Sequence, residues 1–211
     1  PQSNLNNQLA GVDLNLRSSN WWNEQSVSWH GFYMTSDDEN ENSDDVIGTH
    51  FTFPNYPFRA SGHWVRTGDN FNPALGFVRR RGGESTGLGF TYYFEQPENE
   101  LLEDISVGAE YDRYEWLDGD LDSDELEINL IGIRTLAGDF LGLEVEFERD
   151  ILQEPFEIID EVIIPSSEYK GVDFELEFRS SNIRPVGGEF EIAYGHCYGG
   201  KATNAAIDLS W

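Results

Sequence analysis

The sequence predicts an all-β protein, an antiparallel up-and-down transmembrane β-barrel or a large part of one. Two observations lead to this fold class. Apolar and polar residues alternate along about eleven runs, and such alternation gives strands with one apolar and one polar face. Turn-forming clusters separate the runs, whereas capped segments with apolar residues at helical spacing are absent. We therefore expect residues 1–211 to form a single β-barrel region.

The first five predicted strands precede residue 96. In the first, Val12, Leu14 and Leu16 alternate with Asp13 and Asn15. The acidic turn SDDENENSDD separates the second strand from the third, and the turn EQPENE follows the fifth. The five predicted ranges are 9–17, 26–34, 46–53, 57–66 and 85–95.

Six further strands are predicted in the remainder of the chain, at 102–115, 124–134, 139–150, 168–179, 187–195 and 202–211. The turns LDGDLDSD and VGG precede two of them. The strands 139–150 and 168–179 alternate most strictly, with glutamates on the polar face. Their apolar residues are Leu141, Leu143, Val145, Phe147, Val172, Phe174, Leu176 and Phe178.

Strand length favours a membrane-spanning sheet. Several runs have about 10–14 residues, above the mode of about 5–6 for globular strands, and about ten alternating residues between turns are typical of a transmembrane β-strand. Aromatic residues also gather near strand ends, where they form interfacial girdles in barrels or the edge of a core in soluble proteins. These aromatic positions are Trp21, Trp22, 51–58, 92–94, 114–116 and Trp211.

The acidic strand faces have two interpretations. In a soluble sandwich they are the solvated outside, and in a membrane barrel they line the lumen while the apolar faces meet lipid. Lysine is scarce, with only Lys170 and Lys201, and this favours the lumen. The predicted lumen residues on these strands are Glu144, Glu146, Glu175 and Glu177.

The charge balance excludes one class of partner. Forty acidic residues against 13 Lys and Arg give a formal net charge of −27, which argues against nucleic acid. This balance suits cations, a basic partner, or simple solubility in salty surroundings. The single cysteine, Cys197, excludes an intrachain disulfide and cysteine-based zinc or haem motifs. No apolar run approaches the roughly 18 residues of a membrane helix.

One loop resembles a calcium site. Asp118, Asp120, Asp122 and Asp124 occupy alternate positions, but the sixth and twelfth positions hold Ser123 and Asn129 instead of Gly and Glu. An acidic hairpin loop is therefore preferred, with weak calcium binding as the alternative. We expect no other metal and no cofactor.

Nothing in the sequence indicates an enzyme. The chain lacks nucleophile-elbow, zinc-protease and phosphate-loop motifs, and paired glutamates are too frequent to identify a glycosidase. Four histidines, at 30, 50, 63 and 196, are scattered and predict no ligand set. We predict no catalytic residue.

An irregular arginine-rich segment, residues 70–83, interrupts the strand pattern. It contains Asn72 and Pro73 in a turn, followed by Arg79, Arg80 and Arg81. In an acidic lumen, guanidinium–carboxylate pairs would pin such a segment inward. We therefore predict a latch or constriction that contacts at least two carboxylates of the polar strand faces.

The stretch GDNFNPALGFVRRRG resembles a signature of bacterial outer-membrane proteins of the DUF5916 group, in which a family-9-like carbohydrate-binding module precedes a long β-barrel region. The matching residues are Asn70, Phe71, Asn72, Pro73, Gly76, Phe77 and Arg80. A later region of the chain is also similar to the family, through Leu152, Pro155, Phe156, Ile158, Ile164, Pro165, Tyr169, Arg184, Tyr198 and Gly199.

This resemblance implies a location in the bacterial outer membrane and a role in glycan handling, but it supplies no catalytic residues. The carbohydrate-binding module and several family strands are missing here, so the resemblance implies an internal portion of the barrel region. The spacing before Tyr169 also departs from the family pattern, because Ser166 stands where a small residue followed by Gly is expected.

The function expected is passage or binding of a solute, such as a saccharide, at the cell surface. The partners expected are the lipid bilayer, a glycan, and the remainder of a longer polypeptide or another β-subunit. One alternative is a soluble acidic β-sandwich that binds carbohydrate through Trp21, Trp22, Trp29 and Trp64. Another is a structural or assembly protein that pairs with another chain through exposed strand edges.

The first and last predicted strands, 9–17 and 202–211, are expected to pair with strands from outside the chain. About eleven strands is an odd number, whereas single-chain bacterial barrels have even counts. Neither strand carries the proline, lysine or bulge devices that protect a free edge.

Overall fold

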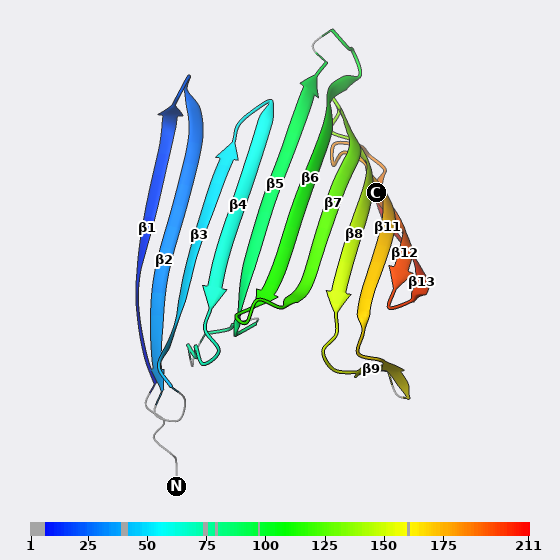
Figure 1. Ribbon diagram of the computed structural model, residues 1–211. Coiled ribbons are helices and arrows are strands. Elements are labelled where there is room, and N and C mark those ends of the chain that lie inside the picture. The colour runs from blue at the N-terminus through cyan, green and yellow to red at the C-terminus, as the bar shows by residue number, and fades with distance from the viewer. Residues whose placement is uncertain (1–6, 39–41, 74–75, 79, 97, 160) are drawn as a thin grey trace. The chain divides into compact units, whose positions relative to one another are not determined.

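A computed structural model describes residues 7–38, 42–73, 76–78, 80–96, 98–159 and 161–211 of the chain. Its secondary structure is all-β, and the described residues contain no helix. Figure 1 shows the strands in chain order. They are β1 Asn7–Trp21, β2 Gln25–Asp38, β3 Asp44–Pro54, β4 Phe58–Thr67, β5 Gly83–Glu95, β6 Leu102–Trp116, β7 Leu121–Thr135, β8 Phe140–Ile151, β9 Phe156–Ile159, β10 Val162–Ile164, β11 Glu168–Arg179, β12 Gly187–Cys197 and β13 Gly200–Ser210.

Eleven strands form one antiparallel sheet in the order β1-β2-β3-β4-β5-β6-β7-β8-β11-β12-β13. Each corresponds to one predicted range, so the all-β, antiparallel, up-and-down prediction is confirmed. Among the described residues β1 and β13 stand at opposite ends of the order and do not pair, and the sheet is not closed into a barrel. The barrel itself stays a prediction.

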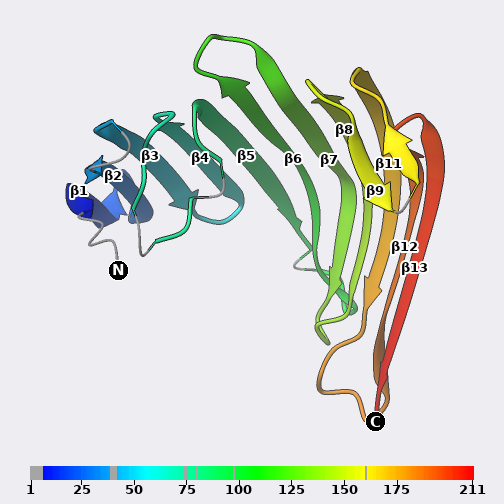
Figure 2. The same ribbon diagram turned by 90° about the horizontal axis from the view of Figure 1, so that it is seen from below.

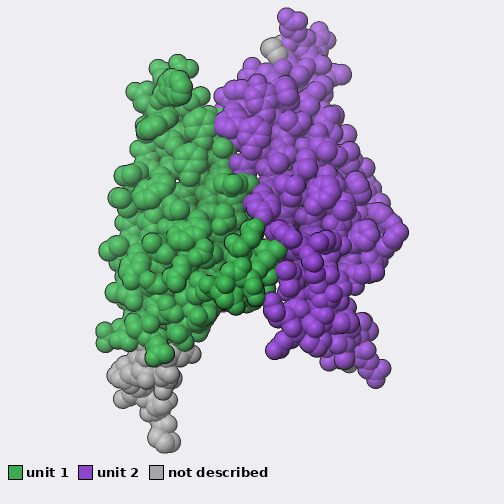
Figure 3. Space-filling view, in the orientation of Figure 1, with its two compact units in different colours: residues 1–55, 60–88, 112–122 green, residues 56–59, 89–111, 123–211 purple. Residues whose placement is uncertain are grey.

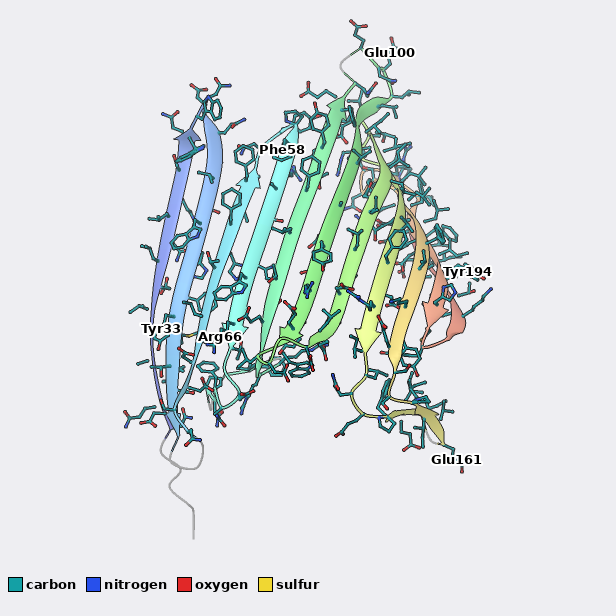
Figure 4. All side chains as sticks on the ribbon, viewed as in Figure 1. Tyr33, Phe58, Arg66, Glu100, Glu161 and Tyr194 are labelled. Carbon is teal, nitrogen blue, oxygen red and sulfur yellow. The ribbon has the colours of Figure 1, made fainter. Side chains whose placement is uncertain are left out.

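Two strands were not predicted. β9 and β10 pair as a separate antiparallel hairpin between β8 and β11 (Figure 2), with Phe156 opposite Ile164. Near its tip, Glu161 has a φ of 69°, a left-handed conformation that suits a tight turn. Figure 4 labels this residue. Strands of four and three residues are too short to show an alternation that a sequence pattern could detect.

The chain divides into two compact units, coloured separately in Figure 3. Unit 1 comprises residues 1–55, 60–88 and 112–122, and unit 2 comprises residues 56–59, 89–111 and 123–211. The arginine-rich segment belongs to unit 1, and the strands with the strictest alternation belong to unit 2.

Burial is low for a protein of this length. Among the described residues, the buried hydrophobic side chains are Val46, Phe71 and Val145. Many large apolar side chains are instead exposed, because the strands with strict alternation form a single layer with no second large sheet among the described residues to cover it. The described residues therefore lack the inter-sheet core that a β-sandwich requires.

Within unit 1, Phe71 of the arginine-rich segment is only 3% exposed. Main-chain hydrogen bonds fix the segment beside it. The Asn72 amide donates to Ser36 Oγ of β2 at 2.8 Å, and the Asn70 amide donates to Asp44 Oδ2 of β3 at 2.9 Å. An apolar anchor and two hydrogen bonds thus hold this irregular segment against the ends of two strands.

Candidate functional site

The β7, β8, β11 and β12 strands of unit 2 carry carboxylates on one face, here called the acidic face. The register places Glu144 opposite Glu175, and it places Glu146 opposite both Glu127 and Asp173. On β12, Glu191 lies opposite Glu177. The acidic face consists of Glu125, Glu127, Glu144, Glu146, Glu148, Asp173, Glu175, Glu177, Glu189 and Glu191.

Like charges that lie directly opposite on neighbouring strands repel one another, so this face costs folding free energy unless cations or water screen it. One arginine balances its edge. Arg179 donates to Glu177 and, at 3.4 Å, to Glu189. The centre of the acidic face, around Glu144 and Glu146, concentrates negative potential, which attracts cations and repels anions.

The opposite face of the same strands is apolar. Leu143 lies opposite Leu176, and Val145 lies opposite Phe174. The apolar face continues onto β7 and β12 through Ile128 and Tyr194, the latter labelled in Figure 4. Phe174 is 51% exposed, although it stands mid-strand between apolar neighbours. The described residues of unit 2 place no second large sheet over this face, although neighbouring side chains bury the smaller Val145.

Charged residues bound the apolar face at one end. Arg149 of β8 lies opposite Asp124 of β7 and donates to both oxygens of its carboxylate, from Nε at 2.9 Å and from Nη2. Lys170 of β11 lies on the other side of Arg149 and forms an ion pair with Glu168 at 2.9 Å. We call these four residues the first charged rim.

A second charged rim bounds the other end of the apolar face. Asp139, in the turn before β8, is 8% exposed, and its carboxylate accepts hydrogen bonds from Arg184 Nε at 2.7 Å and from the Ser181 amide at 2.9 Å. Thr135 Oγ1 donates to it at 3.1 Å. The Arg184 guanidinium, and next the Ser181 amide, hold the pKa of Asp139 well below its ordinary value.

Asp139 and Arg184 were not predicted as a pair. Asp139 lies 45 residues before Arg184, and no local pattern links the β7–β8 turn to the β11–β12 loop. In the sequence, Arg184 was identified only as one of the residues that match the family resemblance. The sequence signal that could have indicated the pair is Arg184 itself, a single arginine in a loop of a chain that has few Lys and Arg residues.

The arginine-rich segment contacts residues of unit 1. Arg80 Nη1 lies 2.5 Å from Asp122 Oδ2, and its guanidinium stands 4.9 Å from the centre of the Tyr114 ring. Arg81 donates to Asn72 Oδ1 at 3.4 Å. Pro73 follows Asn72 in the described part of the segment, whereas Arg79 lies outside the described residues.

Contacts with at least two carboxylates of the polar strand faces stay a prediction, while the structure gives a carboxylate contact at Arg80. Its partner is an aspartate at the start of β7, not one of the glutamates of the acidic face, which belong to unit 2. The role of Glu144, Glu146, Glu175 and Glu177 as lumen residues stays a prediction.

The four aspartates of the calcium-like loop are not arranged around a common point. Asp118 Oδ1 accepts a hydrogen bond from the Asp120 amide at 3.0 Å, which is an ordinary turn contact. Asp122 is bound by Arg80, and Asp124 is bound by Arg149. Among the described residues, no group of three or more His, Cys, Asp or Glu side chains has an arrangement that could hold a metal ion.

Three histidines that seemed scattered in the sequence stack on one another in unit 1. His30 of β2 lies opposite His50 of β3, with ring centres 6.0 Å apart, and the His50 ring stands 5.8 Å from that of His63 of β4. His63 Nε2 also lies 3.1 Å from Ser85 Oγ and 3.7 Å from Asp112 Oδ1. Sequence analysis missed this stack because it depends on strand register.

The four tryptophans of the carbohydrate-binding alternative are divided among three places in unit 1. Trp21 and Trp22 stand at the β1–β2 turn, and Trp22 is 85% exposed. Trp29 lies mid-strand in β2, opposite Leu16 and Phe51. Trp64 of β4 donates from Nε1 to Glu84 at 3.2 Å.

The described residues hold no helix that is long and apolar enough to cross a bilayer. The resemblance to the outer-membrane family stays a prediction, because no family model, curated protein or solved structure matches the chain.

Proposed function

We propose that this chain forms part of the wall of a bacterial outer-membrane β-barrel that passes or binds a solute, such as a saccharide, at the cell surface. The apolar face meets lipid, and the acidic face lines the passage. The observation that carries the proposal is the exposed apolar face of unit 2 with a charged rim at each end.

The dimensions of this face support a lipid environment. From Leu141 to Phe147 the apolar residues of β8 span six residue steps, about 20 Å at about 3.4 Å per residue. The apolar belt of outer-membrane barrels is about 25 Å tall, and its strands are tilted. The rims that contain Asp139 and Arg149 flank this span, where a membrane strand reaches headgroups and water.

Unit 1 repeats the pattern. Val12 lies opposite Tyr33, and Tyr33 lies opposite Ile47. Leu16 lies opposite Trp29, which in turn lies opposite Phe51. Each of these side chains is exposed by 38% or more. Soluble monomers rarely leave such continuous apolar surface exposed, because exposing apolar surface to water costs about 25 cal/mol of free energy for each Å².

The acidic face supports a selective passage. Carboxylates that line a barrel interior favour cations and neutral polar solutes over anions. A saccharide suits such a surface, because its hydroxyl groups donate hydrogen bonds to carboxylates.

The test is to refold the full chain with and without phosphatidylcholine vesicles and to measure flotation with the vesicles and circular dichroism. We expect β-sheet that floats with the lipid, and aggregated or unfolded chain in its absence. A chain that folds as a monomer in buffer and stays with the soluble fraction would support the sandwich alternative instead.

A further inference from the structure

The last strand of the large sheet, β13, has a free edge. Among the described residues it pairs only with β12, and the register is unbroken over eleven residue pairs, from Gly187 opposite Ser210 to Cys197 opposite Gly200. The strand contains no proline and no bulge, and its one lysine, Lys201, stands at its start. Natural proteins usually protect an edge of this length by such devices, so β13 is open to pairing.

The contacts of Gly188 show which main-chain groups of β13 point outward. The Gly188 amide donates to Ser180 Oγ at 2.7 Å, and its carbonyl accepts from the Ser180 amide at 2.9 Å. The main-chain groups of Gly188 thus point away from β13. Leu209 of β13 lies opposite Gly188. In an antiparallel pair, two opposite residues that do not hydrogen-bond to each other both direct their main-chain groups away from the pair. The main-chain groups of Leu209 therefore point to the free edge of β13. The outward groups of β13 therefore include those of Thr203, Ala205, Ile207 and Leu209.

The side chains of these same four residues lie on the apolar face. Ile207 lies opposite Phe190, and Ala205 lies opposite Ile192. The residues between them, such as Asn204 and Asp208, lie on the acidic face. A strand that adds to this edge continues both faces only if its own residues alternate between apolar and polar.

Strand direction restricts the origin of the added strand. All neighbours in the sheet are antiparallel, and β1 is first and β13 eleventh in the order, so these two edges run in the same direction. A second copy inserted in the same orientation would present its β1 parallel to β13, whereas outer-membrane barrels are antiparallel. A copy that paired β13 with β13 would have to cross the membrane in reverse.

We propose that the free edge of β13 binds an antiparallel, amphipathic β-strand from a polypeptide segment that is neither within residues 1–211 nor a second copy of them. The argument against a second copy rests on the proposed function, because it needs both copies in one membrane orientation. In hydrocarbon the outward amide and carbonyl groups of β13 have no water to bind, so strand addition is what satisfies them.

The probe is a synthetic peptide with the β12 sequence GGEFEIAYGHC, the natural antiparallel neighbour of β13, activated at its cysteine with a thionitrobenzoate group. Two variants of the full chain are compared in detergent micelles, each with Cys197→Ser and a single new cysteine. One carries Gly200→Cys and the other Ser210→Cys, at the two ends of β13 and both on the acidic face, where the peptide cysteine also lies. Release of the coloured thiolate measures disulfide exchange with the peptide.

Antiparallel addition brings the peptide cysteine to the Gly200→Cys end, so we expect exchange there to be about tenfold faster or more, from the raised effective concentration. Adding Ala205→Pro removes an outward amide without breaking a bond to β12, and it should abolish the difference. If Ala205→Pro lowers the β-sheet content measured by circular dichroism, Thr203→Pro is used instead.

Equal exchange rates at the two ends, or faster exchange at Ser210→Cys, would overturn the proposal. So would a difference that survives the proline substitution, because the peptide would then be displacing β12. A dimer joined through Ala205→Cys in a peptide-free sample would assign the edge to a second copy. None of these results depends on vesicle flotation, so the lipid proposal and the edge proposal fail separately.

Discussion

Arg184 donates from its guanidinium to both oxygens of Asp139 and so joins the β11–β12 loop to the β7–β8 turn. Asp139 stands next to the first residue of β8, and this contact fixes the end of the apolar face. A bidentate pair of this kind is among the stronger polar contacts in proteins. The pair therefore orders one rim of unit 2.

We expect Asp139→Asn to lower the stability of unit 2. The substitution keeps the side-chain shape but removes the charge and one acceptor, so Arg184 loses its bidentate partner. The measurement is the midpoint of denaturant unfolding in micelles. Glu154→Gln, in the exposed β8–β9 connection, is the matched control and should leave the midpoint unchanged. Equal midpoints for both variants would show that the pair is only a surface contact.

The same carboxylate makes stability depend on pH. Its pKa is lowered in the folded state, chiefly by Arg184, whereas an unfolded aspartate titrates near pH 4. The stabilisation is therefore present above about pH 4 and is lost as the pH falls towards the folded pKa. We expect the midpoint difference between the wild type and Asp139→Asn to be constant near neutrality and to shrink in strong acid. A difference that grows in acid would contradict this assignment.

Much of the fold could be predicted from the sequence, because alternation is a local property. Each of the eleven predicted strands has a counterpart in the large sheet, including β11 and β12, whose faces follow from Phe174 and Glu191. The β9–β10 hairpin could not be predicted, because strands of three or four residues show no period.

The contacts between strands were harder to predict, because they depend on register and on loop paths. The His30–His50 stack needs the β2–β3 register, and the Asp139–Arg184 pair needs two connections to meet. Asp122 illustrates the same limit. The loop pattern indicated a weak calcium ligand, whereas the structure places this carboxylate against Arg80. Side-chain types indicated charge pairing, but only the fold identifies the partners.

Charge reversal at Arg80 should loosen the arginine-rich segment. Arg80→Glu loses the contact with Asp122 and the cation–π contact with Tyr114, and it places like charges together. We expect a loss of about 1 kcal/mol of unfolding free energy. The second variant, Arg80→Glu with Asp122→Arg, should recover part of this loss.

The control for this cycle is Arg17→Glu on β1, which changes the charge equally. Denaturant unfolding followed by tryptophan fluorescence, with the single variant Asp122→Arg included, gives the coupling between positions 80 and 122. A coupling near zero, with equal losses for Arg80→Glu and Arg17→Glu, would show that the segment is not held by this pair.

Neighbouring residues of β11 provide a matched pair for the lipid proposal. Phe174→Arg places a charge on the apolar face, and Glu175→Arg places the same side chain on the acidic face. We expect Phe174→Arg to destabilise the vesicle-inserted chain by about 2–4 kcal/mol, the range known for arginine near the middle of a bilayer. Glu175→Arg should have little effect, since it relieves repulsion from Glu144. Similar losses for both would contradict a lipid-facing apolar side.

The most direct measurement is a fluorescence scan along β11 in vesicles of brominated phosphatidylcholine. Single cysteines replace Val172 to Phe178 in turn in a Cys197→Ser background, and each carries the same small fluorophore. We predict strong quenching by the lipid at 172, 174, 176 and 178 and weak quenching at 173, 175 and 177. Uniform quenching, no quenching, or the reverse alternation would contradict the claim that the apolar face of this sheet lies against lipid.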